Sequence, residues 1–309
     1  MTASRPSTIA DAPRGNWVER LAPSWLQPYL RLSRLDRPIG TWLLLLPCWW
    51  SIALAAPSGG LPDPRLVLLF ALGAVVMRGA GCTFNDIVDR DFDARVERTR
   101  NRPLPSRQVS LAQAIGWMVL QSLVGLGVLL LLDPLAIWLG LGSLALVAIY
   151  PFMKRITWWP QFFLGLAFNW GALMGYAAAR GEVSIGALLL YAGGIAWTLG
   201  YDTIYAHQDK EDDALIGVRS SARRLGADTL PWLAGFYAFT LAMLAAAGLT
   251  ERLAWPYWPL LALVALHFGW QLRRVRIDDP ASCLRIFRAN RDAGLLILLA
   301  IVLGRLSGT

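Results

Sequence analysis

Residues 66–93 read LVLLFALGAVVMRGAGCTFNDIVDRDFD. The run before Asn85 is apolar apart from Arg78, and a helix that crosses a bilayer needs about 20 predominantly apolar residues. Asn85, Asp89 and Asp93 then follow at intervals of four residues, and side chains at this spacing share one face of a helix. The stretch therefore predicts a membrane helix followed by a polar stripe.

The rest of the chain has the same apolar character. Hydrophobic residues make up 56% of the 309 residues and charged residues 16%, whereas soluble domains average about half and about a quarter. This composition excludes an ordinary soluble domain and predicts an all-α, polytopic membrane protein with nine transmembrane helices. The ninth window reaches spanning length only if the polar residues 288–292 are tolerated inside a cavity. The expected spans are Pro38 to Ala56, Leu66 to Phe84, Leu111 to Leu132, Pro134 to Met153, Trp158 to Ala179, Val183 to Tyr201, Thr229 to Thr250, Leu253 to Leu272 and Ala293 to Gly304.

The distribution of Lys and Arg predicts the orientation in the membrane. With nine spans, 24 of the 29 basic residues fall in the N-terminal arm and in the loops on its side, and cytoplasmic loops hold the excess of positive charge. We therefore expect a cytoplasmic N-terminus in a plasma (inner) membrane. The net charge of +8 follows this topology, so we expect no nucleic-acid partner.

The chain has no linker rich in Ser, Pro or Gly. We expect a cytoplasmic or interfacial arm over residues 1–37 and a single membrane domain over residues 38–309. Two motif loops, 85–107 and 202–228, follow the second and the sixth expected span and are dense in aspartate and arginine. Asp89 and its counterpart in the second loop lie 120 residues apart, which predicts pseudo-repeated four-helix units around a central cavity.

The second motif loop repeats the acidic pattern of the first. Asp202, Asp209 and Asp213 are spaced by seven and four residues. Like charges four residues apart destabilise a helix by a few tenths of a kcal/mol, so two such stripes require a compensating cation. Mg²⁺ is the natural candidate, because it prefers a few carboxylates together with water and substrate phosphates. Solvated loop charges are the alternative, which a single motif would not exclude.

A pair of acidic stripes with magnesium suits the chemistry of a diphosphate leaving group. Metal and cationic side chains neutralise the charge that grows on the diphosphate as it leaves an allylic carbon. The resulting allylic cation can be attacked by an electron-rich aromatic ring when water is excluded. The pattern therefore predicts a prenyl transfer reaction.

Basic side chains near the motifs could bind the substrates. Arg78 lies inside the second expected span, where a charge is expensive enough to indicate function; it could bind a substrate carboxylate or form a structural ion pair. Lys154 and Arg155 follow the fourth span and could reach a diphosphate, although they could also serve as positive anchors. Arg98 and Arg102 belong to a basic loop that could cover the diphosphate or attract anionic lipid.

Several stretches together resemble the UbiA superfamily of intramembrane prenyltransferases, and within it the branch that prenylates 4-hydroxybenzoate. The resemblance extends over most of the chain. The stretches that carry it are Arg34 to Thr41, Arg78 to Asp86, Asn101 to Ser106, Tyr150 to Arg155, and Tyr201 to Asp213 with Ile216 and Gly217.

The resemblance implies a nine-helix fold with a central cavity and an active site that faces the cytoplasm. It implies transfer of a polyprenyl chain from polyprenyl diphosphate to the ring carbon ortho to the hydroxyl of 4-hydroxybenzoate, in ubiquinone biosynthesis, with Mg²⁺ as cofactor. The expected catalytic residues are Asp89, Asp93, Asp209, Asp213 and Arg155. The expected metal ligands are Asn85, Asp89, Asp93, Asp209 and Asp213. The expected substrate-binding residues are Arg78, Asn85, Lys154, Asp202 and Tyr205.

Two other functions stay open from the sequence. A member of the same superfamily could act on another aromatic or a tetrapyrrole acceptor, against which the stretch from Tyr150 to Arg155 argues. A cation-coupled transporter could also combine intramembrane charges with repeated halves. The acidic stripes, however, are expected at the membrane boundary rather than at its midplane, which favours a lipid substrate with a charged headgroup.

Overall fold

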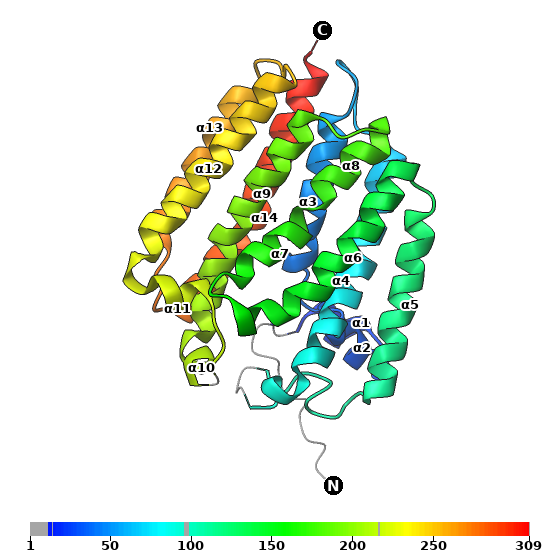
Figure 1. Cartoon of the computed structure of the whole chain (residues 1–309), viewed down its shortest axis with the longest axis vertical. Coiled ribbons are helices and arrows are strands. Elements are labelled where there is room, and N and C mark those ends of the chain that lie inside the picture. Colours follow the sequence, from blue (N-terminus) through cyan, green and yellow to red (C-terminus); the bar gives the residue numbers. More distant parts are fainter. Residues whose placement is uncertain (1–11, 14, 96–98, 216, 309) are drawn as a thin grey trace. The chain divides into compact units, whose positions relative to one another are not determined.

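The computed structural model describes residues 12–13, 15–95, 99–215 and 217–308 (Figure 1). Every regular element in these ranges is helical, which confirms the predicted all-α class. The helices are α1 Trp17–Leu21, α2 Gln27–Leu32, α3 Ile39–Leu54, α4 Pro64–Asp93, α5 Leu111–Leu129, α6 Pro134–Ile156, α7 Pro160–Asn169, α8 Gly171–Arg180, α9 Ile185–Ala206, η1 His207–Asp209, α10 Lys210–Leu215, α11 Ser221–Leu225, η2 Gly226–Asp228, α12 Thr229–Thr250, α13 Tyr257–Arg274 and α14 Pro280–Leu306.

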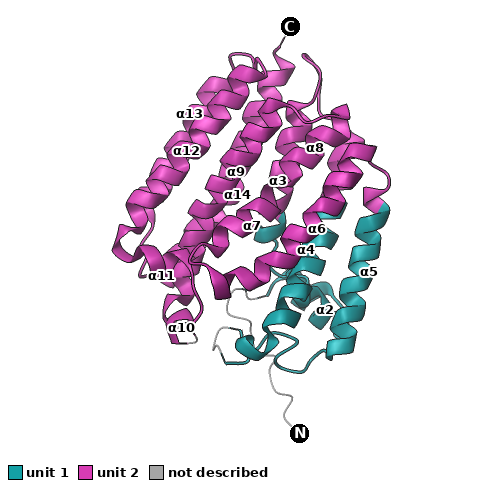
Figure 2. Cartoon of the chain, viewed as in Figure 1, with its two compact units in different colours: residues 1–41, 72–127 teal, residues 42–71, 128–309 magenta. Residues whose placement is uncertain are grey.

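The chain divides into two compact units (Figure 2). Unit 1 consists of residues 1–41 and 72–127, and unit 2 consists of residues 42–71 and 128–309. Helices α3 and α4 each contribute residues to both units. The first acidic stripe belongs to unit 1 and the second acidic motif to unit 2.

Unit 1 has a small apolar core that fixes the segment after α4. Leu104 and Val109 from this segment are buried against Leu32 and Ala114. Burial of a Leu or Val side chain contributes about 1.5–3 kcal/mol. The segment is therefore anchored at its base instead of running freely over the surface.

Unit 2 is organised around α9, which packs against α12, α7 and α14. Several buried polar side chains of this unit are hydrogen-bonded to one another. The Trp197 indole donates to Asn290 at 2.8 Å, the Asn290 amide donates to Gln271 at 3.2 Å, and the Tyr237 hydroxyl donates to Gln271 at 2.7 Å. Such hydrogen bonds hold helices together in an apolar medium. Asn290 thus fits inside α14, and the ninth predicted window lies within a helix of 27 residues.

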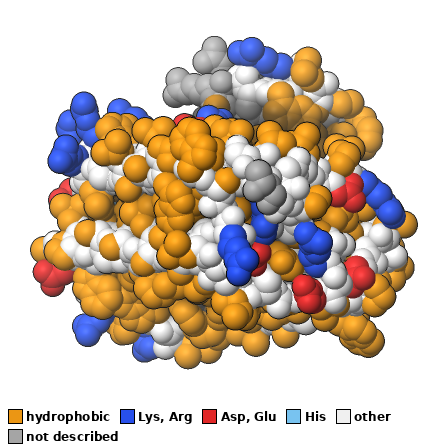
Figure 3. All heavy atoms as spheres, turned by 90° about the horizontal axis from the view of Figure 1, so that it is seen from above, with side chains coloured by type: hydrophobic (Ala, Val, Ile, Leu, Met, Phe, Trp, Pro, Cys, Tyr) orange, Lys and Arg blue, Asp and Glu red, His pale blue; other side chains and the backbone are white. Residues whose placement is uncertain are grey.

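Apolar side chains point outward from the helices. Leu68, Trp138 and Leu266 are 70%, 72% and 69% exposed, which would be costly over so wide an area in water. Figure 3 shows hydrophobic side chains over most of the visible face, with charged side chains scattered among them. Five helical segments among the described residues are long and apolar enough to cross a membrane. The chain is therefore a multi-pass membrane protein.

Each of the nine predicted windows contains helix, with departures in detail: α13, for example, begins at Tyr257, four residues after the start of the window from Leu253 to Leu272. Helix α4 continues through Asp93, so the first motif begins on a helix and not in a loop. The window from Trp158 to Ala179 contains two helices, because α7 ends at Asn169 and α8 begins at Gly171.

The contact between α3 and α8 in unit 2 gives a prediction about stability. A Cβ atom on Gly175 would lie 2.6 Å from the backbone oxygen of Cys48, and a backbone atom cannot move aside cheaply. We expect Gly175→Ala to lower the free energy of unfolding by about 1–3 kcal/mol or more, measured as a lower melting temperature in detergent. Gly235→Ala on α12 is the matched control, because a Cβ there meets nothing within 4 Å; equal losses in both variants would contradict the prediction.

Candidate active site

The first acidic stripe lies on the C-terminal turns of α4. Asp89 and Asp93 are 1% and 8% exposed, and Asn85 is partly buried one turn earlier. Asp91, which lies between the two aspartates in sequence, points away from the stripe with a side chain that is 79% exposed. The helix therefore separates the aspartates of this motif into a buried set and an exposed one, as the four-residue spacing predicts.

A third buried carboxylate, that of Asp86, lies on the same helix beside the stripe. Asp86 is fully buried, and its Oδ1 atom lies 2.5 Å from Arg34 and 3.3 Å from Arg102. Burial lowers the pKa of Arg34, but the charge of Asp86 and the hydrogen bond to it raise that pKa above its usual value overall. The Arg34 guanidinium is thus a permanent cation next to the motif. The backbone of Arg34 lies in the left-handed region, with a φ of 58°.

Arg102 connects Asp86 to the end of the stripe. The same terminal nitrogen that contacts Asp86 lies 2.7 Å from Asp93 Oδ2, and the Thr99 hydroxyl donates to the Asp93 carbonyl oxygen at 2.9 Å. The Arg102 side chain is only 12% exposed. For Arg102 the alternative of membrane-surface attraction is therefore wrong, because the charge is directed inward. Arg98 lies outside the described residues.

Arg78 lies on α4 two turns before Asn85. Its guanidinium packs against the backbone of Gly40, where a Cβ atom would lie 2.6 Å from a terminal nitrogen. A residue larger than glycine at position 40 would displace the arginine. Unit 1 thus joins distant stretches of the sequence twice, where Arg34 and Arg102 meet at Asp86 and where Arg78 meets Gly40.

The second acidic motif in unit 2 differs from the first in geometry. Asp202 lies on α9, Asp209 in the short helix η1 and Asp213 on α10, and all three are partly buried. The predicted continuous stripe is wrong, because a tighter 3₁₀ turn breaks the helical register after Ala206. Tyr205 is partly buried on the last turn of α9 and packs against Phe287, with ring centroids 4.5 Å apart and ring planes at 42° to each other.

His207 is the first residue of η1 and is buried. Its side chain is 6% exposed, and its Nε2 atom lies 3.0 Å from the hydroxyl of Thr229, the first residue of α12. Burial, followed by the nearby charge of Lys210, lowers the pKa of His207 to about 4. The imidazole is therefore neutral at physiological pH and ties the motif to α12 without supplying a positive charge.

The C-terminus of α6 is joined to the segment that follows the second motif. The Arg219 amide donates to the Lys154 carbonyl at 2.9 Å, and the Val218 amide donates to the Asp213 carbonyl at 2.9 Å. The short segment from position 213 to position 219 therefore connects the second motif to Lys154. Arg155 is exposed beside Phe152, with its guanidinium carbon 5.8 Å from the ring centroid. Unit 2 therefore brings the C-terminus of α6 next to the segment after the second motif, although the two are far apart in the sequence.

Three charged residues near the motifs were not identified from the sequence as site residues. Asp36 is 2% exposed, and burial raises its pKa despite Arg37 at 3.5 Å. Arg34 appeared only as part of a resembling stretch. Arg219 stacks over Trp158 at 5.6 Å and donates to the Ile156 carbonyl. These roles depend on contacts between distant segments, for which local spacing gives no signal.

The donor atoms of both motifs suit a hard divalent cation. They are carboxylate and amide oxygens, the ligands that Mg²⁺ prefers. Within the described ranges, no group of three or more His, Cys, Asp or Glu side chains could hold a metal ion by itself. Mg²⁺ usually completes its coordination with water and substrate phosphates, so this donor set fits magnesium bound together with a diphosphate.

Comparisons with known proteins agree with this chemistry. The model of the UbiA prenyltransferase family matches residues 44–301. The 4-hydroxybenzoate polyprenyltransferase of Bos taurus mitochondria is 52% identical over 94% of this chain and 78% of its own length. The mitochondrial enzyme of the same name from Arabidopsis thaliana is 48% identical over 94% of this chain and 72% of its own length.

Solved structures show the same fold at lower identity. A UbiA homolog from Aeropyrum pernix K1 superposes with a TM-score of 0.71 and 24% identity, over 85% of this chain and 96% of that one. A UbiA homolog from Archaeoglobus fulgidus, bound to GPP and Mg²⁺, gives a TM-score of 0.68 and 18% identity, over 89% and 99%. The family match, the two enzymes and the common fold lead to one conclusion: this chain belongs to the UbiA prenyltransferase family.

Proposed function

We propose that the protein transfers a polyprenyl chain from polyprenyl diphosphate to 4-hydroxybenzoate, at the ring carbon ortho to the hydroxyl, and releases diphosphate in ubiquinone biosynthesis. The observation that carries this proposal is the identity of about half of all residues, over 94% of the chain, with enzymes that bear this name. The acidic motifs and their arginines are the groups that the reaction requires.

Mg²⁺ is the proposed cofactor, as in the Archaeoglobus fulgidus homolog that binds it with a prenyl diphosphate. Asn85, Asp89 and Asp93 would hold Mg²⁺ in unit 1, and Asp209 and Asp213 would hold Mg²⁺ in unit 2. When bound, the metal would neutralise the charge that develops on the departing diphosphate. Asp89 and Asp93 lie one helical turn apart on the buried face of α4, and their carboxylate oxygens are ligands that Mg²⁺ prefers, which supports this assignment.

The remaining predicted residues would bind the two substrates. Lys154 and Arg155 end α6 close to the second motif, and a guanidinium there can contact phosphate oxygens bidentately. Asp202 and Tyr205 on α9 would position the substrate beside them. Arg78, packed against Gly40, would bind the carboxylate of 4-hydroxybenzoate. The apolar helices exclude water, so that the allylic cation is attacked by the aromatic ring.

We also propose nine spans around a central cavity, an inner-membrane location and a cytoplasmic N-terminus. The asymmetric distribution of basic residues supports this orientation. An odd number of spans places the C-terminus on the opposite side of the membrane. We therefore expect a reporter enzyme that works only outside the cytoplasm to be active when fused to the C-terminus and inactive when fused to the N-terminus; the reverse pattern would contradict the topology.

Product formation by the purified protein tests the proposed reaction. In liposomes that contain a polyprenyl diphosphate and 4-hydroxybenzoate, we expect a prenylated hydroxybenzoate that requires Mg²⁺ and disappears with EDTA. Benzoate without the hydroxyl is the control acceptor, because its ring is less nucleophilic at the same position. Tight, magnesium-dependent binding of the diphosphate without any product would contradict the acceptor and favour another member of the superfamily.

A further inference from the structure

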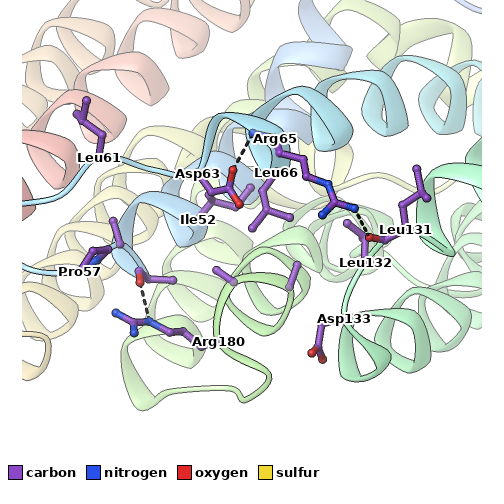
Figure 4. Close-up of a pocket in the computed structure, with 14 residues that line it drawn as sticks. Ile52, Pro57, Leu61, Asp63, Arg65, Leu66, Leu131, Leu132, Asp133 and Arg180 are labelled. Atoms are coloured by element: carbon purple, nitrogen blue, oxygen red, sulfur yellow. Dashed lines mark hydrogen bonds between the residues drawn. The ribbon is translucent and has the colours of Figure 1, made fainter.

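A polar pocket lies within unit 2, where the ends of several helices meet. It has a volume of about 410 Å³. Its wall combines two arginines, Arg65 and Arg180, with two aspartates, Asp63 and Asp133, and with apolar side chains such as Leu66. Figure 4 shows that these residues come from the loop before α4, the start of α4, the loop before α6 and the end of α8.

The pocket lies at the boundary of the membrane. Three segments that are long and apolar enough to span a bilayer begin or end there: Pro64–Asp93 and Pro134–Ile156 begin there, and Pro160–Arg180 ends there. Lys154 and Arg155 occupy the opposite end of Pro134–Ile156, on the side of the second acidic motif. A span of 23 residues is about 35 Å long at 1.5 Å per residue. The pocket therefore faces the headgroups of the leaflet away from that motif.

The two arginines are anchored but not neutralised. Arg180 donates from Nε to the Ala55 carbonyl at 2.7 Å, and Arg65 donates from one terminal nitrogen to the Leu131 carbonyl at 3.3 Å. Neither forms an ion pair with any carboxylate in the described part of the chain. By contrast, Arg305 is paired with Glu251 at 2.7 Å. The guanidinium groups of Arg65 and Arg180 keep further N–H donors for an anion, and phosphate is the anion that matches them best.

The two aspartates show that the ligand is not a simple anion. Asp63 Oδ1 accepts the Arg65 amide at 2.8 Å, and Asp133 Oδ1 accepts the Leu135 amide at 2.9 Å. Each carboxylate thus caps a helix through its Oδ1 atom. Two carboxylates and two guanidiniums in one pocket complement a ligand that carries a negative and a positive group. The leucines of the wall complement an apolar chain.

We propose that this pocket binds a membrane phospholipid whose headgroup carries a phosphate and a primary ammonium, as in phosphatidylethanolamine. The arginines hold the phosphate, the aspartates accept hydrogen bonds from the ammonium, and the acyl chains lie along the apolar wall. A phosphatidylglycerol headgroup lacks the ammonium and offers the carboxylates only neutral hydroxyl donors, which form weaker hydrogen bonds than a cation does. A phosphatidylcholine headgroup has no N–H donor for them.

Native mass spectrometry of the full-length protein tests the proposal. The delipidated protein is titrated with phosphatidylethanolamine, phosphatidylglycerol or phosphatidylcholine of equal chain length. We expect the ethanolamine lipid to be retained most tightly. Arg65→Gln combined with Arg180→Gln should weaken its binding at least about tenfold, which corresponds to about 1.4 kcal/mol. Arg252→Gln is the matched control, because this arginine is exposed, as Arg65 and Arg180 are, but does not line the pocket.

A second double variant tests the selectivity directly. Asp63→Asn with Asp133→Asn preserves the helix caps, since asparagine caps as well as aspartate, and should shift the preference toward phosphatidylglycerol. Equal retention of all three lipids by the wild type, or an unchanged preference in both double variants, would overturn the proposal. Displacement of the lipid by soluble glycerophosphoethanolamine at a similar concentration would overturn a membrane lipid as the occupant.

Discussion

Asp89→Asn and Asp209→Asn each reduce prenyl transfer by at least about a hundredfold, the loss typical of removing one preorganised charge at a reacting centre. Asparagine keeps the size of the side chain but removes the charge that attracts a divalent cation. We expect the fall mainly in kcat, because the missing attraction is greatest as the diphosphate leaves. The Mg²⁺ concentration needed for half-maximal activity should rise in the same variants.

The motifs themselves supply the controls for this experiment. Asp91→Asn changes an aspartate of the first motif whose side chain is 79% exposed, and Glu211→Gln changes an exposed acid beside Asp209. Both should keep nearly full activity. Circular dichroism and melting temperature establish that the inactive variants are folded. If Asp89→Asn or Asp209→Asn turned over like the wild type in the same liposomes, the motif that contains the substituted aspartate would not belong to the catalytic site.

Arg102→Gln lowers both the stability and the activity of the protein. Arg102 lies 2.7 Å from Asp93 and 3.3 Å from Asp86, and removing one partner of a buried ion pair costs about 3–5 kcal/mol. We expect a melting temperature lower by several degrees. The activity should fall as well, because Asp93 loses the side chain that orients it.

A double-mutant cycle distinguishes this ion pair from general disruption. If Arg102 acts through Asp93, the variant that combines Arg102→Gln with Asp93→Asn should lose less stability than the sum of the two single losses. Arg95→Gln is the control for the loop, because this side chain is exposed. Additive losses within about 0.5 kcal/mol would show that the two residues are not coupled.

The membrane helices could be predicted from hydropathy because lipid selects long apolar runs whatever they pack against. The window Thr229 to Thr250 coincides with α12. The last helix was underestimated, because its first half carries charged residues that a hydropathy window rejects. The sequence nevertheless contains the signal for its start, an aspartate followed by a proline. In the structure Asp279 caps the helix by accepting two hydrogen bonds, and Pro280 follows at the first helical position.

The candidate site was predictable where a single helix determines it. The spacing of Asp89 and Asp93 was sufficient to place both on the buried face of α4. The second motif could not be read in the same way, because the chain passes from α9 into the short helix η1 between Asp202 and Asp209. The pairing of Asp86 with Arg34 was equally out of reach, since it joins residues that are 52 positions apart.

The left-handed backbone of Arg34 also matters for protein engineering. A residue with a Cβ atom in this conformation costs roughly 1–2 kcal/mol, so stability rules based on backbone geometry would recommend glycine or asparagine at position 34. Either replacement would relax the chain locally but would take a cation away from Asp86, which is fully buried. A design that aims to raise the stability of this enzyme should therefore leave Arg34 unchanged and introduce glycine only at other positions.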